Sequence, residues 1–384
     1  MSTAASTSAT AATSPLRRWS SSRTGVWAGF ALAAVLLFAL APAVLSDFRL
    51  SMLARYLCLA IVAVGIGLAW GRGGMLTLGQ GVFFGLGAYV MAMHLKLADA
   101  AATGGVPDFM LLYGDGTVPG WWVPLRSPIV ALLAVVLVPA ALAALLGLAT
   151  FRRRVKGAYF AILSQALAAA FAILLIGNQA TTGGTNGLTG FRSFFGYDLN
   201  DPVNQRMLFS ITAGVLLAVV AGVRLLMRSR YGELLVACRD AEERVRFLGY
   251  DPATVKTVAY VLAAALAGIA GALFVPVVGI ISPADVGVIP SIGLLIGVAI
   301  GGRTTLLGPV LGTVAVAWAE TSLSESFPSF WVYFQGALFM LVITFLPGGL
   351  ASLPALLRRR RRERAGVREA TTLPGDLVAV EGPA

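Results

Sequence analysis

The chain has 384 residues, of which 58% are hydrophobic and only 12% are charged. Soluble domains carry about a quarter of their residues as charged side chains, so this composition excludes an ordinary soluble domain. Several apolar runs reach the roughly 20 residues that a helix needs to cross a bilayer, and they lack the period-two alternation of a membrane β-barrel. The sequence therefore predicts an all-α, polytopic transmembrane helical bundle.

The formal net charge is +11. Lys and Arg collect in the cytoplasmic loops of membrane proteins, so a basic balance predicts no nucleic-acid partner here. The two cysteines, Cys58 and Cys238, are expected at different depths, which argues against a disulfide. The single histidine, His94, ends an apolar run and is interpreted as an interfacial residue, so we expect no metal site and no cofactor.

The expected domain organisation is a Ser/Thr-rich disordered tail at 1–24, one transmembrane domain at 25–350, and a basic, then disordered tail at 351–384. About ten spans are predicted, and a count of eight to ten is compatible with the pattern because the eighth and ninth are short. The predicted spans are 26–46, 50–70, 74–95, 128–150, 157–177, 206–226, 256–278, 289–301, 305–320 and 329–347.

The charge pattern predicts the orientation. If the N-terminus is cytoplasmic, roughly 23 of the 29 Lys and Arg residues fall on the cytoplasmic side, so we expect both termini there. The segments 96–127 and 178–205 then lie outside. The basic run at 358–364 is expected next to anionic lipid.

Glycines spaced four residues apart predict close helix packing in lipid. These are Gly81 and Gly85; Gly293, Gly297 and Gly301; and Gly308 and Gly312.

One polar segment, the island at 228–252, is too charged to span a membrane, and its signals predict two short helices. Asp240 is the expected N-cap of the second helix, with Glu243 completing a capping box. Gly249 suits the left-handed position after that helix, and Asp251, followed by proline, is expected to cap the next span. Two acid-first pairs, Asp240–Arg244 and Glu242–Arg246, are expected to add a little stability.

Apolar residues recur along the island at helical spacing, which makes it amphipathic. They are Leu234, Cys238, Ala241, Val245 and Leu248. From the residues alone, two interpretations stay open. The island could lie on the membrane surface, or it could dock on a cytoplasmic partner.

The usual catalytic motifs are absent from the sequence, so no catalytic residues and no enzyme activity are expected. There is no phosphate-binding G-x-x-x-x-G-K-[ST] loop, and the segment at 301–305 lacks the lysine. No intramembrane carboxylate pair is evident either, which weakens a proton-coupled mechanism. The isolated charges Arg55 and Glu320 are interpreted as interfacial.

Five segments resemble permeases of the branched-chain amino acid/urea group of ABC importers. They are "GMLTLGQGVFFGLGAYV" (74–90), "VKGAYFAILSQAL" (155–167), "GGTNGLT" (183–189), "YGELLVACRDAEERVRFLGYDPATVKTVAYVLAAALAGIAGALF" (231–274) and "GGRTTLLGPVLG" (301–312). The resemblance covers about 50–350. "RDAEERVRFLGYD", "VPDFM…GWWVP" and "VPVVGIISP" look most like the urea transporter permease, whereas Gln80 is more familiar from the amino-acid branch.

The resemblance implies a multi-pass subunit of a bacterial inner membrane that works with partners: a second homologous permease, two cytoplasmic ATP-binding subunits and a periplasmic solute-binding protein. It also implies that the island is a coupling helix docked on an ATP-binding subunit. The residues expected to carry that role are Tyr231, Gly232, Glu233, Ala237, Arg239, Asp240, Glu243, Arg246 and Gly249.

The solute predicted from the resemblance is urea, and the alternative within the family is a branched-chain amino acid. A secondary transporter without an ATPase partner is the alternative from another class. Urea is neutral, so its path needs hydrogen-bonding groups without a counter-charge. The candidate path residues are Thr77, Gln80, Gln165, Asn178, Thr185 and Asn186, each of which could instead bond between helices.

Overall fold

The computed structural model describes residues 23–101, 105–155, 157–326, 331–345 and 349. Both predicted tails and the basic run at 358–364 therefore lie outside the described residues, apart from Arg23 and Thr24. These two residues belong to the first described helix, α2 (Arg23–Val35).

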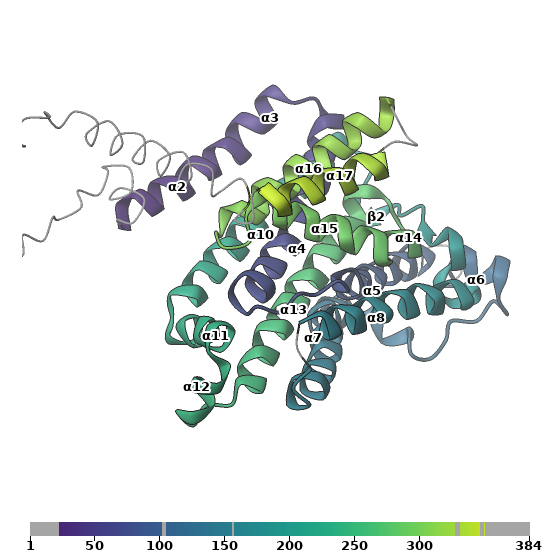
Figure 1. The fold of residues 1–384 in the computed structure, drawn as a ribbon. Helices are drawn as coiled ribbons and strands as arrows, with labels where there is room; N and C mark the ends of the chain where they lie inside the picture. The colour runs from purple at the N-terminus through teal and green to yellow at the C-terminus, as the bar shows by residue number, and fades with distance from the viewer. Residues whose placement is uncertain (1–22, 102–104, 156, 327–330, 346–348, 350–384) are drawn as a thin grey trace, which may run out of the picture.

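The described residues are almost entirely helical, which confirms the all-α prediction (Figure 1). The first half contains α2, the π-helical turn η1 (Leu36–Leu40), α3 (Ala41–Val44), α4 (Asp47–Ile66) with its π-helical continuation η2 (Gly67–Arg72), α5 (Gln80–Ala101), α6 (Asp108–Tyr113), the 3₁₀ turn η3 (Val123–Arg126), α7 (Pro128–Arg152) and α8 (Ala158–Gly177). The second half contains α9 (Gln179–Thr182), η4 (Gly184–Asn186), α10 (Pro202–Arg228), α11 (Arg230–Asp240), α12 (Glu242–Phe247), α13 (Pro252–Val278), α14 (Pro283–Val286), α15 (Val288–Gly301), α16 (Leu307–Ser326) and α17 (Trp331–Phe345).

Four two-residue strands form two small antiparallel pairs. The strand β1 (Leu188–Thr189) pairs with β4 (Ile280–Ile281), and β2 (Ser193–Phe194) pairs with β3 (Tyr197–Asp198). The first pair ties the segment after α8 to the end of α13, although the two are far apart in sequence.

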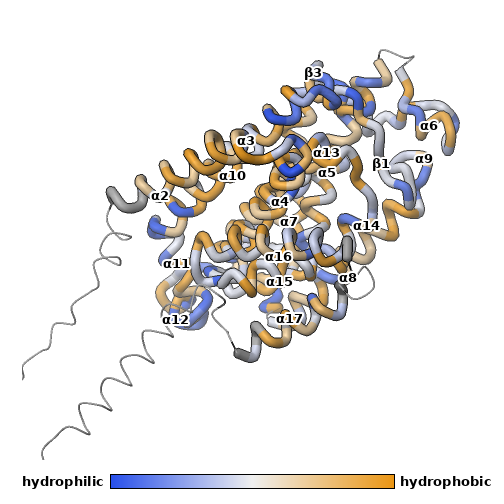
Figure 2. The backbone as a smooth tube through the Cα atoms, turned by 90° about the horizontal axis from the view of Figure 1, so that it is seen from above, coloured by the Kyte–Doolittle hydropathy of each residue, from blue (hydrophilic) through white to orange (hydrophobic). Residues whose placement is uncertain are grey.

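Each predicted span overlaps a described helix, although the helix bounds differ at several ends. Among the described residues, seven helical segments are long and apolar enough to cross a membrane: Trp27–Val44, Asp47–Arg72, Gln80–Ala101, Pro128–Arg152, Ala158–Gly177, Pro202–Arg228 and Pro252–Val278. α15 is a shorter apolar helix. Figure 2 shows hydrophilic residues gathered around α11 and α12 and around β3, with hydrophobic helices between them, as expected for a bundle that crosses a bilayer.

The long helix α13 lies at the centre of the bundle and packs against α4, α5 and α7 (Figure 1). Glycine permits the closest of these approaches: a Cβ at Gly87 would meet the backbone of Gly268, and one at Gly271 would meet the backbone of Phe84. Such contacts replace the hydrophobic driving force that is missing between helices in lipid.

The predicted glycine spacings also mark real contacts. α15 and α16 touch where Gly301 meets Gly308 and Gly312, and Gly297 lies against Thr313. Gly81 and Gly85 both pack against Val286 in the short helix α14. A Cβ at Gly293 would meet only the side chain of Gln335 within 4 Å, so this position requires glycine less strictly than the others.

The third predicted span was wrong at its start. Residues 74–79 are not helical, and α5 begins only at Gln80. Gly74 has φ +69°, a left-handed conformation that glycine tolerates and other residues rarely adopt. The chain therefore breaks between η2 and α5, inside an otherwise apolar stretch.

Two hydroxyl groups from other helices satisfy the backbone at this break. Ser164 of α8 accepts the N–H of Leu78 over 2.9 Å, and Ser291 of α15 accepts the N–H of Gly81 over 3.1 Å. Backbone groups at membrane depth require such partners because water is absent there. The first turn of α5 is thus held by two neighbouring helices.

Candidate functional site

The island consists of two short helices, α11 and α12, as predicted. Tyr231 anchors α11 to α13, because its hydroxyl donates to the backbone oxygen of Val255 over 2.8 Å, and burial raises the pKa of this phenol. Arg239 reaches in another direction, with Nη1 donating to the backbone oxygen of Gly71 over 2.7 Å. The island is therefore bonded to both α13 and the end of η2.

The predicted cap of α12 was wrong. Asp240 is the last residue of α11, and Ala241 precedes α12 without a side-chain cap, so Glu243 completes no capping box. The carboxylate of Asp240 instead accepts two hydrogen bonds from Arg239, of 2.7 and 3.1 Å. The guanidinium of Arg239 lowers the pKa of Asp240 through these bonds. This pairing replaces the predicted Asp240–Arg244 pair.

Other local predictions for the island are confirmed. Gly249 has φ +87°. Asp251 caps α13 by accepting the N–H groups of Ala253 and Thr254, and the hydroxyl of Thr254 lowers the pKa of its carboxyl. Glu242 bonds Arg246 over 3.3 Å, as predicted.

Glu242 also bonds Lys256 of α13 over 2.8 Å. α12 is thereby fixed to the following span as well as capped at its exit.

One part of the predicted amphipathic pattern was wrong. Cys238 and Val245 are buried and Leu234 and Ala241 are half-buried, but Leu248 is 76% exposed. It stands beside Phe247, 90% exposed, and near Tyr250, 54% exposed. We call Phe247, Leu248 and Tyr250 the island tip: a small apolar surface at the end of a rigid, bonded element.

The remaining coupling candidates lie on both sides of the island. Gly232 is buried against the backbone end of α10 and Ala237 is half-buried, whereas Glu233 and Glu243 are exposed. Arg246 is held between Glu242 and Glu243.

Two of the six predicted path residues occupy the helix break. Thr77 and Gln80 are fully buried, and Gln80 donates from Nε2 to the backbone oxygen of Ala263 over 2.9 Å. Within the part of the chain that the structure describes, Oε1 of Gln80 has no hydrogen-bond partner, whereas the hydroxyl of Thr77 lies within reach of the buried hydroxyl of Tyr260. Gln165 is half-buried beside Ser164, the residue that holds this break.

The other three path candidates lie elsewhere and are exposed. Asn178 ends α8 and donates to the backbone oxygen of Leu174 over 2.8 Å. Thr185 and Asn186 lie in the 3₁₀ turn η4. Asn186 lines a hollow of about 570 Å³ together with Lys96, Asp108, Arg192 and Asn200. The structure thus separates the six residues into an inner and an outer group.

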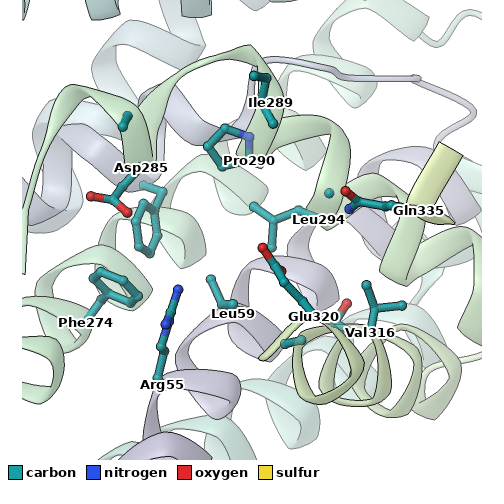
Figure 3. A pocket seen from close by; sticks show the side chains of 15 residues that line it. Arg55, Leu59, Phe274, Asp285, Ile289, Pro290, Leu294, Val316, Glu320 and Gln335 are labelled. Carbon is teal, nitrogen blue, oxygen red and sulfur yellow. The ribbon is translucent and has the colours of Figure 1, made fainter. Parts of the chain in front are cut away.

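Sequence reasoning missed a cavity of about 400 Å³ between α4, α14, α15 and α16 (Figure 3). Arg55, Asp285, Glu320 and Gln335 line it, along with Thr313, which is 3% exposed and whose Oγ1 has no partner among the described residues. Arg55 and Glu320, interpreted as interfacial from the sequence, both line this cavity. The isolated charges in two apolar runs were the available signal.

Two carboxylates line this one cavity, although no intramembrane pair was evident in the sequence. Asp285 and Glu320 are far apart along the chain and come together only through packing. Among the described residues, no group of His, Cys, Asp and Glu is arranged to hold a metal ion.

Comparison with known proteins identifies relatives of this chain. Over 346 residues the chain is 28% identical to the high-affinity branched-chain amino acid transport system permease protein LivM of Escherichia coli K12, covering 83% of this chain and 74% of that protein. It is equally similar, over 348 residues, to LivM of Salmonella typhimurium LT2. No solved structure matches the chain.

A family model described as branched-chain amino acid transport system / permease component matches residues 48–343, which span α4 to α17. That range includes the helix break, the island and the cavity, and it covers more than half of the chain. The relatives are named as permease proteins of transport systems, and together with the apolar helices of this chain they indicate a multi-pass protein of the inner membrane. This chain belongs to the family of branched-chain amino acid transport system permease components.

Proposed function

We propose that this subunit forms half of the path through an ABC importer and that the solute is urea. Its partners would be a second homologous permease, two cytoplasmic ATP-binding subunits and a periplasmic solute-binding protein. In this proposal the energy comes from ATP hydrolysis by the partner subunits. This chain converts their movement into a change in the side of the membrane to which the solute path opens. A stiff connection is needed, because only contacts that differ between two states can shift their populations.

The island is the part of the chain that would receive this movement. Its tip exposes Phe247 and Leu248, and aromatic and aliphatic side chains of this kind anchor protein interfaces. The island is bonded to η2 through Arg239 and to α13 through Tyr231, so a push on the tip reaches the bundle. These bonds favour docking on a partner over a helix resting loosely on lipid.

The observation that carries urea as the solute is the unpartnered side-chain oxygen of Gln80 at the helix break, beside the hydroxyl of Thr77. Oε1 of Gln80 and Oγ1 of Thr77 are buried, and both can accept hydrogen bonds from N–H groups. A buried polar atom without a partner is costly, so it favours a solute that can supply one. Urea offers four N–H donors and carries no charge that would need a counter-ion.

A branched-chain amino acid is the second candidate, and the names of the relatives favour it. Both solutes can be tested on one preparation, in which the chain is reconstituted in liposomes with its partner subunits and binding protein. Uptake of labelled urea, driven by ATP and absent without it, supports the proposal. Uptake of leucine but not urea would replace the solute, and uptake independent of ATP would indicate a secondary transporter.

A further inference from the structure

The cavity in Figure 3 brings one cation and two anions to a single place within the bundle. Arg55 comes from α4, Asp285 from the short helix α14 and Glu320 from α16. Asp285 is already engaged, because its Oδ2 accepts the N–H and the hydroxyl of Ser282. Arg55 and Glu320 lie close enough to interact electrostatically, but among the residues described no hydrogen bond or ion pair engages either side chain, so both can still bind a solute.

The charged residues Arg55 and Glu320 both lie well inside the helices that carry them. Arg55 is eight residues after Asp47, the start of α4, which places it about 12 Å along the helix. Glu320 is six residues before the end of α16 at Ser326, or about 9 Å. Charged side chains at such depth face a water-filled cavity or a protein interior and not lipid, because hydrocarbon cannot solvate them.

A second hollow of about 300 Å³ adjoins the cavity and shares its charged wall, since Arg55, Leu59 and Glu320 line both. The charges therefore stand where the two spaces meet. The formal charges of Arg55 and Glu320 cancel, and Asp285, the third charge of the cavity, is already engaged by Ser282.

We propose that this cavity is a solute-binding station on the predicted outer side of the path, where Arg55 donates to a carbonyl oxygen and Glu320 accepts amide N–H groups. The assignment rests on urea being the solute. Urea combines one carbonyl acceptor with four N–H donors, which matches a guanidinium fork on one side and a carboxylate on the other. The unpartnered Oγ1 of Thr313 supplies a further acceptor in the same wall.

The station lies next to the helix break. Phe84 lines the cavity and is one helical turn after Gln80, on the same face of α5. Its ring packs edge-on against Phe274, which also lines the cavity, with centroids 5.1 Å apart. The cavity is thus linked to the start of α5 through Phe84, which follows Gln80 by one helical turn.

The test compares Arg55→Ala, Arg55→Lys and Glu320→Gln in the reconstituted importer, with Arg49→Ala as the matched control. Arg49 lies on the same helix but does not line the cavity. We expect Arg55→Ala and Glu320→Gln to raise the KM for urea about tenfold or more, because each removes a hydrogen bond to a charged group. Arg55→Lys should recover part of the loss, and Arg49→Ala should change nothing.

A labelling experiment covers the case in which a variant fails to assemble. Ile289 is 75% exposed and lines the cavity, whereas Ile280 is 38% exposed and does not. In Ile289→Cys, millimolar urea should slow modification by a methanethiosulfonate reagent, and in Ile280→Cys it should not. Equal rates with and without urea, or an unchanged KM in Arg55→Ala and Glu320→Gln, would overturn the station.

These outcomes are separable from those that test the transported solute. If the wild-type importer moves leucine and not urea, the proposed solute fails and the station as a urea site fails with it. If the wild type moves urea and the variants do so equally well, the station alone is wrong.

Discussion

Arg239 of α11 and Gly71 of η2 are joined by a hydrogen bond of 2.7 Å across 168 residues of sequence. The side chain of Arg239 also lies against Gly74, where the chain leaves the helix. Three residues later comes Thr77, and then Gln80 opens α5. One side chain therefore connects the proposed docking element to the break that holds the buried oxygens.

Replacing Arg239 with Ala should uncouple the importer. The change removes the bond to Gly71 and leaves the island tip intact, so ATP-binding subunits should still associate while their movement no longer reaches the break. We expect ATP hydrolysis to persist and urea uptake per ATP to fall about tenfold, as for a lost charged hydrogen bond. Both rates are measured in the same proteoliposomes.

The control for this change is Arg153→Ala. Arg153 is an exposed arginine at the end of α7, away from the island contacts described above. It should leave the ratio of uptake to hydrolysis unchanged. A normal ratio in Arg239→Ala would show that the contact with Gly71 carries no movement.

The island tip should govern association with the ATP-binding subunits. Leu248 is 76% exposed on the tip, and Leu112 is 75% exposed on α6 in the predicted outer segment, so the two form a matched pair. Leu248→Ser should weaken co-purification of the ATP-binding subunits, with a loss of about 1–2 kcal/mol if the residue is an interface anchor. Equal recovery of those subunits from Leu248→Ser and Leu112→Ser would contradict docking at the tip.

Close packing around α13 predicts a large difference between two glycines. A Cβ at Gly271 would collide with the backbone of Phe84, whereas one at Gly222 in α10 would meet nothing within 4 Å. Gly271→Ala should destabilise the chain by about 1–3 kcal/mol through overpacking, and Gly222→Ala should be neutral or add up to about 1 kcal/mol of helix propensity. Thermal unfolding of the purified chain in detergent measures both.

The cap at Asp251 should make the start of α13 sensitive to acid. The hydroxyl of Thr254 lowers the pKa of this carboxyl in the folded chain, so the cap's contribution is fully present above the unfolded pKa of about 3.9. It is lost as the pH falls through the lower folded value. The protection factors of the Ala253 and Thr254 amides, corrected for the intrinsic exchange rate at each pH, should therefore fall in acid for the wild type.

Two substitutions separate charge from capping at this position. Asp251→Asn keeps a capping oxygen and removes the titration, so its exchange should not share the acid-dependent change. Asp251→Ala should cost about 1 kcal/mol at neutral pH. Identical acid profiles for the wild type and Asp251→Asn would mean that the carboxylate is not the group responsible.

The sequence was sufficient to predict the helices because apolar length is a local property. It also located the island and the caps at Gly249 and Asp251, whose causes lie within a few residues. The Asp240 cap failed for a local reason that was overlooked: the adjacent Arg239 is a stronger partner than the backbone N–H groups of the next turn.

The cavity could not be predicted in the same way. Arg55, Asp285 and Glu320 reach it from three elements, and nothing in their spacing indicates that these elements meet. The start of α5 was missed for a similar reason. An apolar run through 74–79 has the composition of a span, and only Ser164 and Ser291, on distant helices, make an unwound backbone tolerable there.

The two serine hydroxyls have a mechanical consequence. Each takes one amide of the α5 start, so sliding α8 or α15 along α5 by a single turn would strand an N–H group in hydrocarbon at a cost of several kcal/mol. The unwound segment is consequently fixed to α8 and α15 and cannot act as a flexible hinge by itself. A displacement delivered through Arg239 is carried into α5, α8 and α15 as one body, and the flexing needed for alternating access must occur at its margins.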